Sequence, residues 1–175
     1  MLDDEEYVDI VKDLLEQDSV NQMKRYRQHY DVSTFEHCLS VSYKSYKICK
    51  KLKLDYVSMA RAALLHDLFL YDWRDNGVHK KLTDKHAFTH PSSALENAKK
   101  ITKLNEKEED IILSHMWPIA LRFPKYKESY IITLVDKYSA IQEMIQFYKK
   151  YSLRNNGDVF FKRVSKLLSN INVEM

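Results

Sequence analysis

The sequence predicts an all-α fold, a single-domain helical bundle over residues 1–175. Three observations lead to this prediction: the chain has 175 residues, 45% of them are hydrophobic, and only 2 glycines and 3 prolines are present. The length and apolar content suit one domain with a core, and so few turn-forming residues disfavour a many-stranded sheet. No repeat and no Gly/Ser/Pro-rich linker marks a domain boundary.

Start signals place four helices in the first part of the chain. A first helix is expected over about Asp4 to Glu16, and Ser19 opens a second. The segment Ser33–Glu36 has the spacing of a capping box and begins a long third helix. Asp55 can cap a fourth, which has hardly any polar face over residues 57–69 and is therefore predicted to be the central helix.

The third helix carries a buried stripe that includes a histidine. Four residues fall within about 60° of one another at 100° per residue: His37, Val41, Ile48 and Leu52. His37 is therefore expected to face the core. The helix also holds both cysteines, Cys38 and Cys49, which lie about 16 Å apart along its axis, too far for a disulfide. We expect reduced core thiols.

A long polar segment separates the fourth helix from the next one. The fourth helix ends in His66-Asp67-Leu68-Phe69, and residues 71–90 then form a loop that is long for a compact domain, which suggests a functional role. Pro91 suits the first position of the following helix, whose apolar residues lie on the side of His90.

Three further helices are predicted toward the C-terminus. Asn105–Glu108 is a second capping-box pattern and opens a helix that brings His115 to the inward face before Pro118. A helix near Lys127 to Tyr151 places Asp136 among apolar neighbours. A last amphipathic helix is expected around residues 160–171.

Charge and hydropathy exclude several classes of protein. The net charge of +3 comes with no long basic tract. Nucleic-acid binding by Lys24–His29 would need a broad basic face, and the acidic residues interspersed along the chain argue against one, so nucleic acid is not expected as a partner. No apolar run approaches the roughly 20 residues of a membrane helix. The acidic N-terminus MLDDEEYVDI lacks the features of a signal peptide. We expect a cytoplasmic protein without a membrane partner.

Six polar side chains are predicted to face the apolar interior. They are His37, His66, Asp67, His90, His115 and Asp136. Each one alone could be a hydrogen-bonded core residue, because buried polar groups usually find partners. Together they offer six nitrogen and oxygen donors that suit Mn²⁺, Fe²⁺, Zn²⁺ or Mg²⁺, and a carboxylate can bridge two ions.

The order of these residues resembles the HD-domain metal-dependent phosphohydrolases over about residues 30–145. The matching segments are EHCLSV at His37, LLHDLFLYDW at His66-Asp67, and TLVDKYSA at Asp136. HPSSA at His90 and LSHMWP at His115 are similar to the two additional histidines of the binuclear members.

The resemblance implies a binuclear site and a hydrolytic reaction. One metal ion would be held by His37, His66, Asp67 and Asp136, and the second by Asp67, His90 and His115, with Asp67 bridging. His66 and Asp67 would be the catalytic pair. A hydroxide bridging the ions would attack a phosphate ester or anhydride of a small nucleotide or phosphorylated metabolite. Whether one or two ions bind, and whether they are Fe, Mn, Zn or Mg, stays open.

The residues that follow the HD pair depart from the well-known subfamilies. Leu68–Tyr71 replaces the small-residue-plus-lysine pattern of many binuclear members and the acidic pair of the alarmone hydrolases, and the chain also lacks the GYP signature of the cyclic di-GMP enzymes. None of those substrates is therefore transferred to this chain.

Four residues are candidates for substrate binding. Arg74 could clasp a phosphate, although a salt bridge to a neighbouring aspartate fits equally, and Trp73 could stack on a base. Lys137 follows Asp136, where a solvated lysine is the alternative. His86 lies four residues before His90 and could contact substrate or replace His90 as ligand; Pro91 and the family pattern favour His90. His29 and His79 are expected at the surface.

Two other functions are compatible with the same ligands. Some HD-fold proteins resembling inositol oxygenase hold a mixed-valent di-iron pair and activate O₂, and ligand identity does not separate these from hydrolases. A non-catalytic, metal-stabilised ligand sensor would be indicated by a missing ligand, and none is missing. We expect a small phosphorylated substrate as partner and leave a homodimer open.

Overall fold

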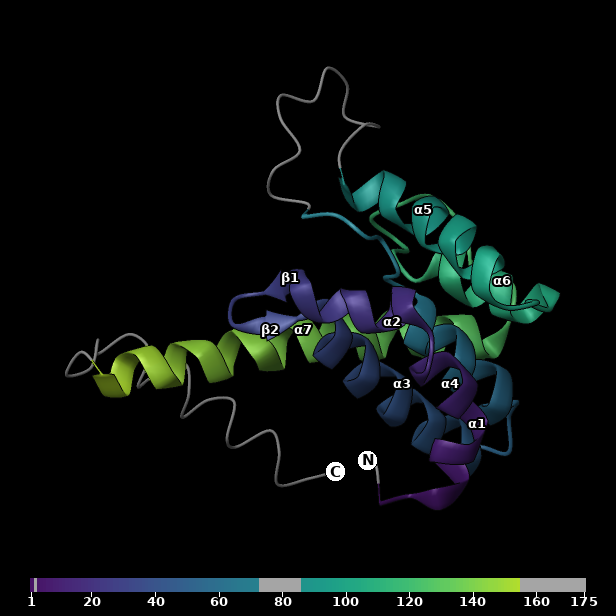
Figure 1. Ribbon diagram of the computed structural model, residues 1–175, viewed down its shortest axis with the longest axis horizontal. Coiled ribbons are helices and arrows are strands. Elements are labelled where there is room, and N and C mark those ends of the chain that lie inside the picture. The colour runs from purple at the N-terminus through teal and green to yellow at the C-terminus, as the bar shows by residue number, and fades with distance from the viewer. Residues whose placement is uncertain (2, 73–85, 155–175) are drawn as a thin grey trace.

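The computed structural model describes residues 1, 3–72 and 86–154, and it has the predicted all-α fold (Figure 1). In the described ranges the only strands form one short antiparallel pair. The elements in chain order are α1 (Glu5–Leu15), α2 (Asp18–Gln22), the 3₁₀ turn η1 (Met23–Arg25), β1 (Arg27–His29), β2 (Val32–Ser33), α3 (Thr34–Lys51), α4 (Tyr56–Leu65), α5 (His86–Ile101), α6 (Glu106–Ser114) and α7 (Lys127–Arg154). The helix predicted around residues 160–171 lies outside the described part of the chain.

The predicted capping signals start the helices that carry the site. Ser33 and Glu36 form a complete capping box at α3, and Asn105 and Glu108 form another at α6. The Asp55 side chain accepts a hydrogen bond from the Ser58 N–H at the start of α4. Each cap satisfies backbone donors that have no partner within the helix and contributes about 1 kcal/mol.

Helix α4 occupies the centre of the core, as predicted from its lack of a polar face. It contacts α1, α3, α5, α6 and α7, and its residues Met59–Leu65, apart from Arg61, are fully buried. The interior next to it includes the two free thiols, Cys38 and Cys49, as predicted. Burial raises the pKa of Cys49 to about 12, so this thiol stays protonated. Within the described residues, no helix is both long and apolar enough to cross a membrane.

Helix α3 packs against helix α7. The Asp31 carboxylate, just before β2, pairs with Lys150, whereas Lys44, further along α3, donates to Ser139. This pairing brings the first turns of α3 against the middle of α7, and both helices contribute residues to the site.

The hairpin before α3 was not predicted. Tyr30 takes a left-handed conformation, with φ of 52°, at the turn between β1 and β2. Its ring stacks on Phe147 of α7 with 4.7 Å between centroids. The hairpin therefore lies over α7 (Figure 1) and carries Gln28 and His29 toward the interior.

Two predictions about the end of α3 and the start of α5 are wrong. Ile48 and Leu52 are exposed, because the buried side of α3 shifts at its C-terminal end toward Tyr46 and Cys49; Tyr46 packs there against the rings of α1 and α4. Pro91 lies inside α5 instead of at its first position. Only about one turn precedes it, so the missing N–H removes little from the helix, and the fixed φ of proline is itself helical.

Two boundaries also differ from the predicted ones. Helix α4 ends at Leu65, so His66 caps its C-terminus and Asp67 lies beyond the helix. Helix α2 begins at Asp18, one residue before Ser19.

Candidate metal centre

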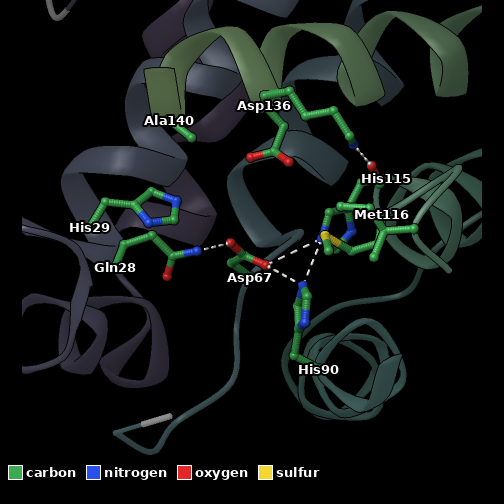
Figure 2. Close-up of a pocket in the computed structure, with 10 residues that line it drawn as sticks. Gln28, His29, Asp67, His90, His115, Met116, Asp136 and Ala140 are labelled. Atoms are coloured by element: carbon green, nitrogen blue, oxygen red, sulfur yellow. Dashed lines mark hydrogen bonds and ion pairs between the residues drawn. The ribbon is translucent and has the colours of Figure 1, made fainter. Parts of the chain in front are cut away.

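All six predicted ligands meet in the interior of the protein. They come from five elements: His37 from α3, His66 and Asp67 from the end of α4, His90 from α5, His115 from the end of α6, and Asp136 from α7. None of the six is more than 8% exposed. Asp67 lies between Gln28, His90 and His115, with Asp136 nearby on α7 (Figure 2).

His66 and His115 are held in the same way at the ends of two helices. Each is the C-cap residue of its helix, and each ring Nδ1 donates to the carbonyl oxygen three residues earlier, Ala63 at 2.8 Å and Ile112 at 2.7 Å. The bond satisfies a carbonyl that the helix leaves free. It also fixes the proton on Nδ1, so that Nε2 carries the lone pair needed by a metal ligand.

The two oxygens of Asp67 face different histidines. Oδ1 lies 3.2 Å from His90 Nε2 and 3.4 Å from His115 Nε2, and these two nitrogens are 2.8 Å apart. Oδ2 lies 3.4 Å from His66 Nε2 and accepts a hydrogen bond from the Gln28 amide. The Asp67 carboxylate therefore stands between two groups of nitrogen donors, as a bridging ligand would.

His37 lies between two carboxylates of α7. Its Nε2 is 3.0 Å from Asp136 Oδ1, and its Nδ1 is 2.8 Å from Glu143 Oε1. The same Asp136 oxygen is 3.7 Å from His66 Nε2. Two sets of ligand atoms thus share His66, each within 4.8 Å: His37, His66 and Asp136, and His66, Asp67 and His115.

The electrostatics of the cluster favour positive charge. Burial opposes ionisation of Asp136, but the imidazoles of His37 and His66 lower its pKa. Burial also opposes ionisation of Asp67, and His66 and His90 lower its pKa. Burial also opposes charging of His37, yet Asp136 and Glu143 raise its pKa to about 10. A proton or a metal ion can supply this charge.

The donor atoms fit divalent cations better than protons alone. His66 Nε2 and Asp67 Oδ1 are buried and have no hydrogen-bond partner among the described residues. Such atoms cost free energy unless something binds them. Four imidazoles and two carboxylates suit Mn²⁺, Fe²⁺, Zn²⁺ or Mg²⁺, so the residues present fit the ions that the sequence predicted.

A cavity of about 260 Å³ adjoins the cluster. Gln28, His29 and four of the predicted ligands line it together with Met116, Ile119, Lys137 and Ala140. The prediction that His29 is a surface residue is wrong: it is half-buried, and its ring packs edge-on against His37 at 5.4 Å. The β1–β2 hairpin causes this placement.

Of the four candidate substrate-binding residues, Lys137 is the one whose side chain the structure describes. Lys137 lines the cavity and donates to the backbone carbonyls of His115 at 3.1 Å and Thr133 at 3.3 Å. Trp73, Arg74 and His79 lie outside the described residues. His86 is the first residue of α5, and its side chain is outside the described part of the structure, whereas His90 lies in the cluster, with Nε2 at 3.2 Å from Asp67 Oδ1.

Two residues at the site were missed by the sequence analysis. Gln28 had no signal, because it reaches Asp67 only through the hairpin. Glu143 had one: it follows Asp136 by seven residues, which is two helical turns, and therefore occurs on the same face of α7.

Of three comparisons with known proteins, the one with protein-family models gives a match that agrees with this arrangement. No curated protein and no solved structure matches the chain. The HD domain family model matches residues 34–141, a range that covers more than half of the chain and includes all six predicted ligands. The chain therefore belongs to the HD domain family.

Proposed function

We propose that this protein is a metal-dependent phosphohydrolase that cleaves a phosphate ester or anhydride in a small nucleotide or phosphorylated metabolite. The observation that carries the proposal is the position of Asp67 in a buried cluster: its Oδ1 faces the nitrogens of His90 and His115, and its Oδ2 faces that of His66. The family supports the same class, because HD domains are generally metal-dependent phosphohydrolases.

The residues divide the work of such a reaction. His37, His66, Asp67 and Asp136 would hold one cation and Asp67, His90 and His115 the other. Cations bound there would polarise phosphoryl oxygens and lower the pKa of water. No serine, threonine or cysteine is found among the described residues that line the cavity, so water is the attacking group in our proposal.

The cavity supports a small, anionic substrate. Lys137 is the only lysine or arginine among its described lining residues. An ammonium has three donors, and two of them are engaged by the carbonyls of His115 and Thr133. The third can donate to a phosphoryl oxygen, while Met116, Ile119 and Ala140 offer apolar surface to the rest of the molecule.

The test combines metal analysis with a screen of phosphorylated metabolites. The wild-type protein, loaded with Mn²⁺ or Fe²⁺, is expected to release inorganic phosphate from one or more compounds. Asp67→Asn should lose this release. Asp110→Asn is a matched control, because the Asp110 side chain is also buried but, among the described residues, accepts its hydrogen bonds from the Lys125 N–H and the Ser129 hydroxyl.

Two results would contradict the proposal. Full activity and metal content in Asp67→Asn would show that the cluster is not the site. Oxygen consumption by the iron-loaded protein, without phosphate release from any compound, would support the di-iron oxygenase instead.

A further inference from the structure

We infer that Glu143 is a positioning residue of the metal centre: by accepting a hydrogen bond from His37 Nδ1, it directs His37 Nε2 toward the metal ion and strengthens that ligand. The inference rests on the proposed metal centre. Glu143 belongs to neither of the proposed ligand sets, and it acts through His37.

The geometry around the His37 ring leaves little choice of roles. The ring is fully buried, with Glu143 Oε1 at 2.8 Å from Nδ1 and Asp136 Oδ1 at 3.0 Å from Nε2. A neutral imidazole has one N–H and one lone pair. Because Asp136 and His66 gather on the Nε2 side, this nitrogen must present the lone pair when an ion is bound. Nδ1 then carries the proton and donates a hydrogen bond to the Glu143 carboxylate.

Helix geometry explains why one helix supplies both carboxylates. Asp136 and Glu143 are seven residues apart on α7, which places them within about 20° of each other around the helix axis. His37 on α3 fits between them. One face of α7 therefore supplies both the ligand Asp136 and Glu143, the residue that orients the neighbouring ligand His37. Any rotation of α7 that moved Asp136 would also move Glu143.

A lysine of α3 places positive charge beside this part of α7. Lys44 lies seven residues after His37 on α3. Its ammonium donates to Ser139 and Gln142 of α7, which precede Glu143 by four residues and one residue. Burial lowers the pKa of Lys44, and the nearby carboxylate of Glu143 opposes that shift. A hydrogen bond from Nδ1 to a carboxylate makes Nε2 a stronger electron-pair donor to a metal ion than a hydrogen bond to a neutral group would.

A direct ligand role for Glu143 is the main alternative. His29, His37 and Glu143 also have donor atoms within 4.8 Å of one another, which could suggest a third ion. That site would need a lone pair on His37 Nδ1 at the same time as one on Nε2, and a neutral ring has only one. We therefore favour the positioning role.

The experiment measures metal affinity by competition with a chelator, using Mn²⁺ and the 175-residue chain. Removing a hydrogen-bond partner of a metal-bound histidine typically weakens affinity or activity about 10–100-fold. Glu143→Ala should weaken the site that contains His37 by this amount, and Glu143→Gln by less, because its amide oxygen can still accept the hydrogen bond from Nδ1. Glu128→Gln is the matched control, since Glu128 is buried on the same helix but binds Lys107 and the Asp55 N–H.

A spectroscopic measurement separates positioning from a purely structural role. In the Zn²⁺-loaded protein, the His37 Nδ1 proton should be slowly exchanging and shifted far downfield in the NMR spectrum of the wild type. The resonance should persist in Glu128→Gln, move upfield in Glu143→Gln, and disappear in Glu143→Ala.

The possible failures are distinguishable. Equal Mn²⁺ affinity in the wild type and Glu143→Ala would overturn the inference while leaving the metal centre intact. Loss of one whole equivalent of metal in both Glu143 variants, with unchanged affinity of the rest, would make Glu143 a direct ligand. If the wild type bound no metal under any condition, the proposed function itself would fail.

Discussion

Replacing Asp67 by asparagine should remove the part of the thermal stability that depends on metal ions. Asparagine has nearly the same size, and its amide oxygen can still accept the hydrogen bond from Gln28. The substitution removes the negative charge from the carboxylate that faces three histidine nitrogens, those of His90 and His115 at Oδ1 and that of His66 at Oδ2. It should therefore weaken both metal positions together, with little change in packing.

The size of the effect follows from linkage between binding and folding. An ion at 100 times its dissociation constant stabilises the folded state by about 2.7 kcal/mol per site. For a chain of this length, 1 kcal/mol shifts the melting temperature by about 2–4 °C, so one occupied site adds roughly 5–11 °C. Two sites add roughly 11–22 °C, and Asp67→Asn should lose most of this increment.

The assay is thermal unfolding at increasing Mn²⁺ concentration, with chelator-treated protein as the starting point. Asp110→Asn provides the control, because it changes a buried aspartate that contacts none of the six predicted ligands. Its own melting temperature can differ from the wild type, but its rise with Mn²⁺ should not. An equal rise in Asp67→Asn and the wild type would refute a bridging role for Asp67.

Three further predictions concern single side chains. His90→Ala should keep about one equivalent of metal but lose most of the turnover, as elemental analysis and a phosphate-release assay would show; two equivalents would contradict the proposed ligand set. Lys137→Met should keep its metal and raise KM, whereas an unchanged kcat/KM would exclude contact with substrate. Burial opposes ionisation of Glu128, but Lys107 lowers its pKa below the ordinary 4.5. This pair therefore stabilises the fold above that pH, and its contribution disappears as the pH falls through the lowered pKa. The free energy of unfolding in urea should therefore fall less on acidification in Glu128→Gln than in the wild type. Parallel curves of this free energy against pH would contradict the prediction.

Local signals were sufficient for much of the fold. Ser33 with Glu36, and Asn105 with Glu108, predicted the starts of α3 and α6, because a capping box is satisfied within four residues. The apolar character of residues 57–65 likewise predicted the central position of α4, since a helix without a polar face must be covered on all sides.

Features that depend on contacts between elements could not be predicted in this way. Periodicity assigned Ile48 to the buried stripe of α3 but contains no information on which neighbours cover each turn. Gln28 reaches Asp67 because Tyr30 turns the chain and stacks on Phe147, a contact across more than 100 residues of sequence. The six predicted ligands do lie in the interior, as expected. Each lies on an apolar helix face or at a helix end next to one, and such faces can be read from the sequence.

The ends of α4 and α6 have a consequence for which charges the cluster attracts. Both helices stop at a histidine of the cluster, so their C-terminal ends lie next to the predicted metal positions. A helix dipole places roughly half a negative charge at this end. The backbone of two helices therefore attracts cations, in addition to the carboxylates of Asp67 and Asp136. Bound ions would in turn hold the last turns of α4 and α6, which should then exchange their amide hydrogens more slowly.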